Sequence, residues 1–300
     1  MKRNTSLTWR RVDPKTLDLH ALEVAIVGGT GGLGRALARF MAGRGARVTV
    51  VGQTFRDAGV PGLDFVKADL SSMREAKRVA AALPAETLDI VVFTTGIFAA
   101  SKRQETAEGL ERDMAVSYLS RLVLLREIAP RLGTARPGAT TKPRVFVMGY
   151  PGTGQAGNPG DLNAERSYGA MPVHMNTVAG NEMLVLDAAA RYPNLLCFGL
   201  NPGLVKTNIR DNLLGQNTLK SRLIEATIGL LTVTPETYAE RLAPLLTSAD
   251  LEGHGGALFD RKGDAILPSP KLTDRAYVKA FLDASEALVA RALGRDGAGG

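Results

Sequence analysis

Cysteine, histidine and long apolar stretches are scarce in this sequence, and each scarcity excludes a class of protein. The single cysteine, Cys197, cannot form a disulfide within the chain. This excludes a disulfide-stapled secreted domain and predicts an intracellular, cytoplasmic location. No stretch is long enough to span a membrane, and residues 1–15 lack the apolar core of a secretory signal. The three histidines, His20, His174 and His254, are far apart in the sequence, so no metal site is predicted.

The composition is that of a globular chain with an excess of positive charge. Hydrophobic residues make up 45% and charged residues 22% of the chain, and the formal net charge is +7. The excess suits a phosphate-rich ligand. Basic residues gather only at the start of the chain and no nucleic-acid-binding motif accompanies them, so nucleic acid is not predicted as a partner.

Short apolar runs alternate with segments of helical length and period. The runs that favour strands are residues 24–27, 48–51, 64–66, 90–93, 145–148 and 195–200, with a weaker run at 257–259. The helical segments are residues 32–43, 71–83, 105–132 and 174–191. This alternation predicts an α/β fold in which a doubly wound parallel sheet of about seven strands carries helices on both faces.

No repeat or long linker divides the chain, so we expect one domain over residues 23–293. Residues 1–22 would form an N-terminal arm, and residues 294–300 a flexible tail. Residues 203–233 interrupt the alternation after the sixth strand. Because ligands bind beyond the carboxyl ends of parallel strands, this segment is predicted to be a substrate lid.

A glycine-rich segment joins the first predicted strand to the first predicted helix. It contains Gly28, Thr30, Gly31, Gly32, Leu33 and Gly34. Glycines at 28, 32 and 34 permit a tight turn and a close approach of the backbone to a pyrophosphate, and the helix start presents free N–H groups to the anion. Its position between a strand and an amphipathic helix predicts a dinucleotide-binding Rossmann fold.

The spacing G-x-x-x-G-x-G resembles that of the short-chain dehydrogenase/reductase family, and the resemblance extends over about residues 23–260. Asp69 and Leu70, after the third strand, match family residues that border the adenine. Thr95 and Gly96, after the fourth strand, match the family's Asn-Asn-Ala-Gly region. After the sixth strand, the resemblance implies that a Pro-Gly turn and a threonine hold the nicotinamide, here through Pro202, Gly203, Val205 and Thr207.

The segment after the second strand distinguishes the two nicotinamide cofactors. NAD enzymes tend to place a carboxylate there to bind the ribose hydroxyls, but residues 48–56 contain none. Gln53, Thr54 and Arg56 could instead donate hydrogen bonds to a 2′-phosphate. We therefore expect NADP(H) rather than NAD, although Arg56 could equally be a solvated surface charge.

The residues that perform the family's chemistry are replaced in this chain. The segment is most similar to the branch of retinol and protochlorophyllide reductases, and that resemblance places His174 at the catalytic Tyr and Val178 at the Lys four residues later. Tyr150 lies where the family has a Ser, and Ser117 where it has an Asn. The resemblance thus supports the fold and the cofactor while excluding the family's standard mechanism.

Four residues are candidates for an alternative chemistry. His174 can give or take a proton near neutral pH without a lysine to adjust its pKa. Alternatively, His174 only caps and packs the start of the helix predicted over residues 174–191. Tyr150 could offer its hydroxyl to a substrate oxygen. Tyr168 and Ser117 are weaker candidates, since Tyr168 matches a loop tyrosine that precedes the catalytic helix.

Three functions remain open from the sequence. The first is an NADP(H)-dependent oxidoreductase that acts on a carbonyl or activated double bond of an apolar small molecule. The second is a non-redox isomerase, lyase or cyclase that uses His174 as acid and base, and the third is an inactive NADP-binding sensor or scaffold. The family resemblance further implies a homodimer or homotetramer that associates through the apolar helices of residues 105–132 and 174–191.

Overall fold

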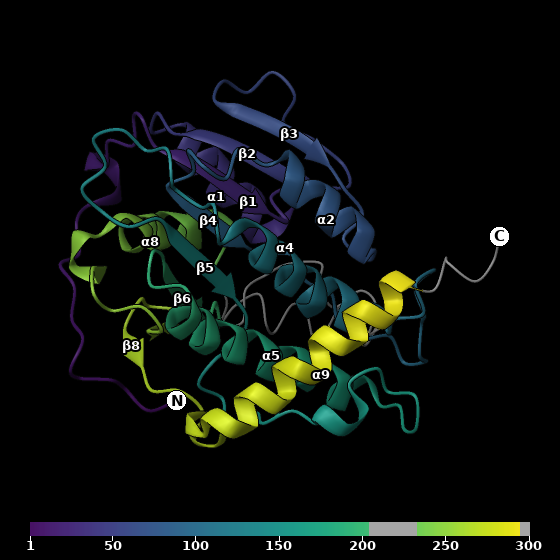
Figure 1. The fold of residues 1–300 in the computed structure, drawn as a ribbon. Helices are drawn as coiled ribbons and strands as arrows, with labels where there is room; N and C mark the ends of the chain where they lie inside the picture. The colour runs from purple at the N-terminus through teal and green to yellow at the C-terminus, as the bar shows by residue number, and fades with distance from the viewer. Residues whose placement is uncertain (204–232, 295–300) are drawn as a thin grey trace, which may run out of the picture.

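The computed structural model describes residues 1–203 and 233–294, and the fold within these ranges is one sheet between two layers of helices (Figure 1). The strands lie in the order β3-β2-β1-β4-β5-β6-β7-β8, and β8 alone is antiparallel to its neighbour. Their bounds are β1 Glu23–Val27, β2 Arg47–Gly52, β3 Leu63–Lys67, β4 Ile90–Phe93, β5 Arg144–Met148, β6 Leu196–Leu200, β7 Leu258–Phe259 and β8 Ala265–Ile266.

Alternating side chains of the strands supply two cores, one under each helical layer. In β1, Ala25 and Val27 belong to one core and Val24 and Ile26 to the other, as the two-residue period of a strand requires. The first core packs under α2 (Met73–Ala82), α4 (Ser120–Ile128), α5 (Ala170–Arg191) and α9 (Arg275–Gly294). The second packs under α1 (Gly32–Ala42) and α8 (Pro235–Thr247).

The order of the strands reverses between β1 and β4. From β1 the chain builds outward through β2 and β3, then returns to β4 on the other side of β1. A crevice beyond the carboxyl ends of the strands is expected at such a reversal, and ligands bind there in open α/β sheets. The glycine-rich loop after β1 and the loops after β4 and β5 all meet at this edge.

The long helix that the sequence predicts over residues 105–132 is shorter and irregular. It consists of α3 (Arg112–Met114), a π-helical turn η2 (Ala115–Leu119) and α4. Residues 105–111 instead form a turn, with Gly109 at φ 76° and an antiparallel bridge between Glu105 and Glu111. The Glu111 carboxylate then caps the helix by accepting from the Met114 amide at 2.8 Å.

The helix predicted to open at His174 begins four residues earlier, at Ala170. Pro172 is tolerated there because the amides of the first turn have no partner within a helix. His174 consequently projects from the second turn of α5 and does not cap the helix. The strands of the prediction agree with β1 to β7, whereas β8, α8 and α9 were not predicted.

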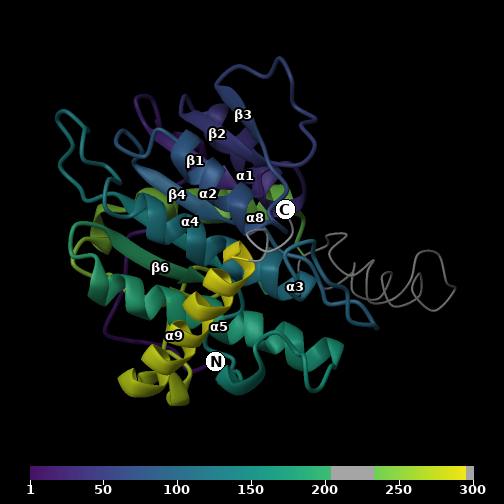
Figure 2. The same cartoon turned by 45° about the vertical axis from the view of Figure 1, so that its right-hand side comes forward.

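Helix α9 lies across the helical layer formed by α4 and α5 (Figures 1 and 2). The Tyr118 hydroxyl donates to Ser285 Oγ at 3.0 Å, and Arg126 Nε donates to Glu286 at 2.9 Å. The leucines of α4 and Leu184 of α5 are buried within this chain, whereas Leu186 is half-buried. The chain's own C-terminal helix therefore covers part of the surface through which the sequence predicts self-association.

The N-terminal arm lies along β8 at the edge of the sheet. The Asn4 amide donates to the carbonyl of Ala265 at 2.8 Å, and the Leu267 amide donates to the carbonyl of Lys2 at 2.9 Å. Farther along the arm, the Trp9 indole donates to the carbonyl of Gly263 at 2.7 Å. The arm thus satisfies backbone groups that an edge strand would otherwise leave open for pairing.

Candidate functional site

Close packing fixes the glycine-rich loop after β1. Gly28 has φ 97°, and a Cβ on it would lie 2.4 Å from the Thr95 amide nitrogen. A Cβ on Gly34 would lie 2.5 Å from the carbonyl oxygen of Gly28 and 2.4 Å from Thr94 Oγ1. These two glycines are required by contact between the loop and the end of β4, before any ligand is considered.

Gly31, in contrast, faces open space at the start of α1. It is the N-cap residue of α1 with φ −159°, and the only atom within 4 Å of a Cβ placed on it is Arg56 Nη1, at 3.9 Å. No side chain caps the helix there, so the first amides of α1 are free for an anion. The loop therefore fits a pyrophosphate at the predicted position, among Thr30, Gly31, Gly32 and Leu33.

A cluster of arginines stands where the ribose of a dinucleotide would be recognised. Arg56 is exposed and donates from Nη1 to the carbonyl of Thr30 at 2.8 Å. The next residue, Asp57, is the first carboxylate after β2, but Arg35 binds it through Nε and Nη2 at 2.8 and 2.7 Å, and Arg39 binds it at 2.6 Å. Hydrogen bonding from Arg35 is the main cause that holds the pKa of Asp57 below its ordinary value.

Asp57 is 4% exposed, and both of its oxygens are occupied. It is therefore not available to ribose hydroxyls. The arginine cluster, defined as Arg35, Arg39 and Arg56, keeps an excess of positive charge over its single carboxylate. Thr54 is exposed on the same turn.

Asp69 and Gln53 face each other after neighbouring strands. Burial would raise the pKa of Asp69, but hydrogen bonds from Ser71 and from the Gln53 side chain outweigh this and lower it. Leu70 is buried beside Asp69. A pocket of about 440 Å³ opens next to them, lined by Ser71, Gln104, Glu105, Thr106 and Arg112.

The nicotinamide end of the predicted site is described in part. Thr95 and Gly96 follow β4, and Thr95 lies against Gly28 of the glycine-rich loop. Pro202 and Gly203 follow β6, where the Gly203 amide donates to Asn201 Oδ1 at 3.0 Å. Val205, Thr207 and nearly all of the predicted lid lie outside the described residues.

His174 is joined to a buried carboxylate that the sequence reading missed. Its Nδ1 lies 2.8 Å from Asp113 Oδ2, and the Asp113 side chain is fully buried in α3. The imidazole stacks on Phe98, with ring centroids 3.9 Å apart and planes at 21°. An ionised carboxylate only accepts, so Nδ1 donates to it and Nε2 is left for another partner. Among the described residues, none forms a hydrogen bond with Nε2.

Ser117 lies at the centre of this arrangement but serves the protein itself. Its hydroxyl is 2.5 Å from Asp113 Oδ1 and accepts from the Ile97 amide at 3.0 Å. It is 4% exposed and lies in the π-helical turn η2. The structure therefore brings Ser117 and His174 together through Asp113, with Ser117 as a support rather than a group open to substrate.

The two tyrosine candidates differ in their surroundings. The Tyr168 hydroxyl donates to the carbonyl of Ala100 at 2.5 Å, and its ring packs with Ala99, Ala164 and Val173. Burial, followed by nearby carboxylates, raises the pKa of Tyr168. Tyr150 lies two residues beyond β5, half-buried, and its carbonyl accepts from the Thr153 hydroxyl at 2.8 Å.

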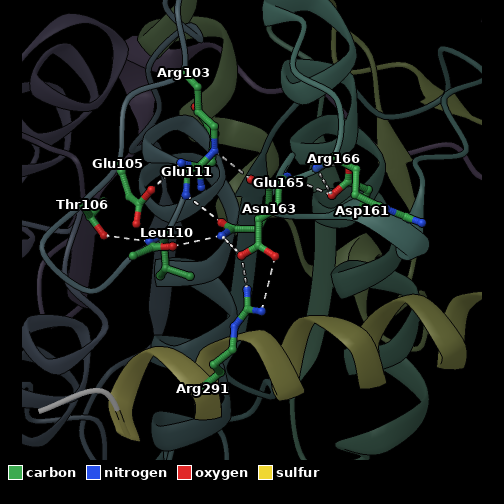
Figure 3. A network of polar contacts seen from close by, with 11 residues as sticks. Arg103, Glu105, Thr106, Leu110, Glu111, Asp161, Asn163, Glu165, Arg166 and Arg291 are labelled. Carbon is green, nitrogen blue, oxygen red and sulfur yellow. Dashed lines mark hydrogen bonds and ion pairs between the residues drawn. The ribbon is translucent and has the colours of Figure 1, made fainter. Parts of the chain in front are cut away.

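A network of polar contacts ties the loops around His174 to α9 (Figure 3). The Asn163 side chain accepts from the Glu111 amide at 2.7 Å and donates to Glu165 at 2.8 Å. Arg103 donates to the Asn163 carbonyl at 3.2 Å, and Arg291 of α9 donates to Glu165 at 2.6 Å. The network fixes Glu111, the cap of α3, and so fixes the helix that carries Asp113.

A second buried group that the sequence reading missed is Arg121 of α4. Its guanidinium donates to the carbonyl of Met148 at 2.6 Å and to Asn181 Oδ1 at 3.0 Å, and also to the carbonyl of Thr95. Asp113, Ser117 and Arg121 follow one another at intervals of four residues along α3, η2 and α4. This polar spacing was the available signal for both missed residues.

The described residues also bear on metal binding and on membrane spanning. Within residues 1–203 and 233–294, no group of three or more His, Cys, Asp and Glu side chains is arranged to hold a metal ion. None of the helices in these ranges combines the length and apolar character that crossing a membrane requires.

Known proteins resemble this chain in sequence and in structure. The family model of short chain dehydrogenases matches residues 23–140. An uncharacterized oxidoreductase of Saccharomyces cerevisiae is 51% identical over 296 residues, covering 97% of this chain and 96% of the yeast protein. Human retinol dehydrogenase 14 is 26% identical over 304 residues, covering 90% of this chain and 87% of the human protein.

A solved short chain dehydrogenase/reductase family protein superposes on 82% of this chain and 99% of its own, with a TM-score of 0.59 at 24% identity. The aldohexose dehydrogenase of Thermoplasma acidophilum superposes on 81% of this chain and 92% of its own, with the same TM-score of 0.59 at 16% identity. These two likenesses bear on the fold alone.

Proposed function

Because the chain belongs to the short-chain dehydrogenase/reductase family, we propose that it is an NADP(H)-dependent oxidoreductase in which His174 takes the place of the missing tyrosine. Its substrate would be a carbonyl or activated double bond of an apolar small molecule. The observation that carries the proposal is the contact between His174 and the buried Asp113 at the carboxyl edge of the sheet. The likeness to a retinol dehydrogenase, named for an apolar alcohol, supports the substrate class.

The bound nicotinamide would supply or accept the hydride, and the chain's own residues would handle the proton. Asp113 accepts from Nδ1 and so fixes the orientation and tautomer of the imidazole. Nε2 would then donate its proton to the substrate oxygen during reduction and take it back during oxidation. Tyr150, close to the end of β5, would hydrogen-bond the substrate oxygen in place of the family's serine.

The preference for NADP(H) is proposed from the arginine cluster. With Asp57 occupied by Arg35 and Arg39, the exposed Arg56 can bind a 2′-phosphate beside Thr54. Gln53 and Asp69 would border the adenosine. The pocket next to Ser71 and Arg112 would receive the adenine end.

The test is loss of NADPH absorbance with a panel of apolar ketones and enones. His174→Gln should reduce kcat by about 100- to 10,000-fold, because it removes a general acid, while leaving NADPH binding intact. The matched control is His254→Gln, since His254 is an exposed histidine on a loop beside β7. Asp113→Asn should also reduce kcat, because an amide could hold the opposite tautomer of His174.

The same assay separates the other two functions. Turnover that persists without nucleotide and disappears in His174→Gln would contradict the redox proposal and support a non-redox acid-base enzyme. Tight NADP(H) binding with no turnover across the panel would instead support a sensor or scaffold.

Self-association and location remain proposals. A homodimer or homotetramer would have to use the part of α4 and α5 that α9 leaves uncovered, or another surface. Light scattering at micromolar concentration tests the assembly, and a mass of 31.8 kDa would contradict it. The proposed cytoplasmic location rests on the single thiol of Cys197, which is buried and whose pKa is raised by that burial to about 12.

A further inference from the structure

Arg121 is a cation enclosed by the fold beside the candidate site. The residue is 3% exposed, and its guanidinium hydrogen-bonds three other elements: the loop after β4 through Thr95, the end of β5 through Met148, and α5 through Asn181. Burying a charge is costly unless it is hydrogen-bonded and balanced. The cost is visible in the pKa of Arg121, which burial lowers to about 9.

Hydrogen bonds connect Arg121 to Asp113, although Arg121 forms no direct ion pair among the described residues. Asn181 accepts from Arg121 at 3.0 Å and donates to the carbonyl of Ser117 at 2.8 Å, and the Ser117 hydroxyl in turn donates to Asp113. The negative charge of Asp113 accordingly opposes the effect of burial on the pKa of Arg121. Asp113 also binds His174 at 2.8 Å and the Ser117 hydroxyl at 2.5 Å. Arg121, Asp113 and His174 are thus linked by charge, with Asp113 in the middle.

The hydrogen bonds of Arg121 continue through Asn181 of α5. Asn181, which accepts from Arg121, donates to the carbonyls of Ser117 and Thr177, at 2.8 Å each. A Cβ on Gly149 would lie 3.3 Å from Asn181 Cβ, so a larger side chain there would crowd this amide. Val178, at the position of the family's lysine, is 5% exposed and cannot carry a charge on α5.

We propose that Arg121 is a positioning residue which supplies from α4 the fixed positive charge that the family supplies from α5. It acts on His174 through Asp113, by offsetting part of the negative charge that would otherwise hold a proton on the imidazole. Proton release from Nε2 to a substrate oxygen is then easier than in an isolated His-Asp pair. The inference rests on the proposed role of His174.

Other charged and titratable groups surround His174 and stay unchanged in the test. Glu111 caps α3, Arg103 lies in the loop after β4, and Tyr168 precedes α5; each interacts electrostatically with its neighbours in this region. The pKa of Glu111 is raised, first by burial and then by Asp113. Their contribution is common to every variant below, so differences between variants report on Arg121.

The experiment follows the imidazole resonances of the full-length protein by NMR as a function of pH, without nucleotide or substrate. The signals of the three histidines are assigned with His174→Gln and His254→Gln. Arg121→Met should move the His174 titration midpoint upward by about one pH unit. Arg121→Lys, which keeps the charge, should leave the midpoint close to that of the wild type.

Arg126→Met is the matched control, because Arg126 also lies on α4 but pairs with Asp187 and Glu286 on the side of α9. An unmoved midpoint in folded Arg121→Met, or an equal movement in Arg126→Met, would overturn the proposal. If Arg121→Met does not fold, Arg121→Gln serves instead, because its amide can still donate to the surrounding carbonyls while the charge is removed. It should move the midpoint upward, and an unmoved midpoint would overturn the proposal equally.

The NMR readout separates this inference from the proposed function, because it requires no turnover. A chain with no activity on any substrate could still show the dependence of His174 on Arg121. In an active enzyme, the pH profile of kcat should shift in parallel with the midpoint in Arg121→Met.

Discussion

Replacing Arg56 with alanine should weaken NADP(H) binding and spare NAD(H). Arg56 Nη1 donates to the Thr30 carbonyl, which places the guanidinium beside the open start of α1, and its other donors remain for a phosphate. A hydrogen bond to a charged group contributes about 1.5–3 kcal/mol. Because Arg56 is exposed and its charge is screened, we expect a contribution at or slightly below the lower end of that range, about 1–2 kcal/mol, or about a 5- to 30-fold rise in Kd.

The assay is calorimetric titration with NADP⁺ and with NAD⁺, at low and at high salt. The Kd for NADP⁺ should rise in the variant and that for NAD⁺ should hold, and the difference should shrink as salt screens the phosphate. Arg47→Ala is the control. Arg47 stands at the opposite end of β2, about 20 Å away along a six-residue strand, and should leave both affinities unchanged.

Equal losses for both nucleotides would refute the reasoning. Such a result would mean that Arg56 only supports the loop, through its bond to Thr30, and that the arginine cluster does not read the 2′-phosphate. No loss for either nucleotide would refute it equally, and would leave Arg56 as a solvated charge.

Three further outcomes are expected from the contacts described above. Gly31→Ala should keep the melting temperature of the wild type but weaken nucleotide binding. Gly34→Ala should lower the melting temperature, because its Cβ would lie 2.5 Å from a carbonyl oxygen. A melting scan in which Gly31→Ala is destabilised and Gly34→Ala is not would contradict both expectations. Asp57→Asn should lower the free energy of unfolding by about 1–2 kcal/mol at neutral pH. Arg35 lowers the pKa of Asp57 in the folded state, so the extra stability of the wild type is complete above the unfolded pKa of about 3.9 and is lost as pH falls through the lower folded pKa. In urea unfolding across that pH window, the free energies of unfolding of the two proteins should converge. A difference that stays constant with pH would count against the ion pair. Tyr118→Phe should cost about 1 kcal/mol in urea unfolding, because it removes the buried bond to Ser285, and a change in nucleotide affinity would contradict a purely structural role.

The sequence predicts the parts of the fold that repeat a strong pattern. Strands β1, β4, β5 and β6 are nearly continuous buried apolar runs, and the glycine spacing marks the turn between β1 and α1. Strand β8 has only two residues, and its place depends on contacts with distant residues, such as Lys2 with Leu267, which local sequence does not reveal. Helix α9 does carry a local signal that the sequence prediction missed, because its buried residues recur at helical spacing: Val278, Phe281, Leu282, Ser285, Leu288 and Val289.

The candidate site divides in the same way. The cofactor loop and His174 could be predicted because a family pattern surrounds them. No role at the site could be assigned to Asp113 and Arg121 from the sequence, because a charged residue in a helix is equally well explained by a position on the solvent-exposed face. Only the fold shows that both are buried and that both reach toward the same edge of the sheet.

The π-helical turn η2 has a geometric consequence for this pair. At 100° per residue, side chains eight positions apart in a regular α-helix are rotated by about 80° from each other. One additional residue in a π turn reduces the effective interval to seven, and the rotation to about 20°. If the same residues formed a regular α-helix, Arg121 would therefore turn away from the helix face that carries Asp113, whereas deleting one residue from Ala115–Leu119 would keep both on one face. The irregular hydrogen bonding of this helix, as well as its sequence, therefore determines which polar side chains share one face.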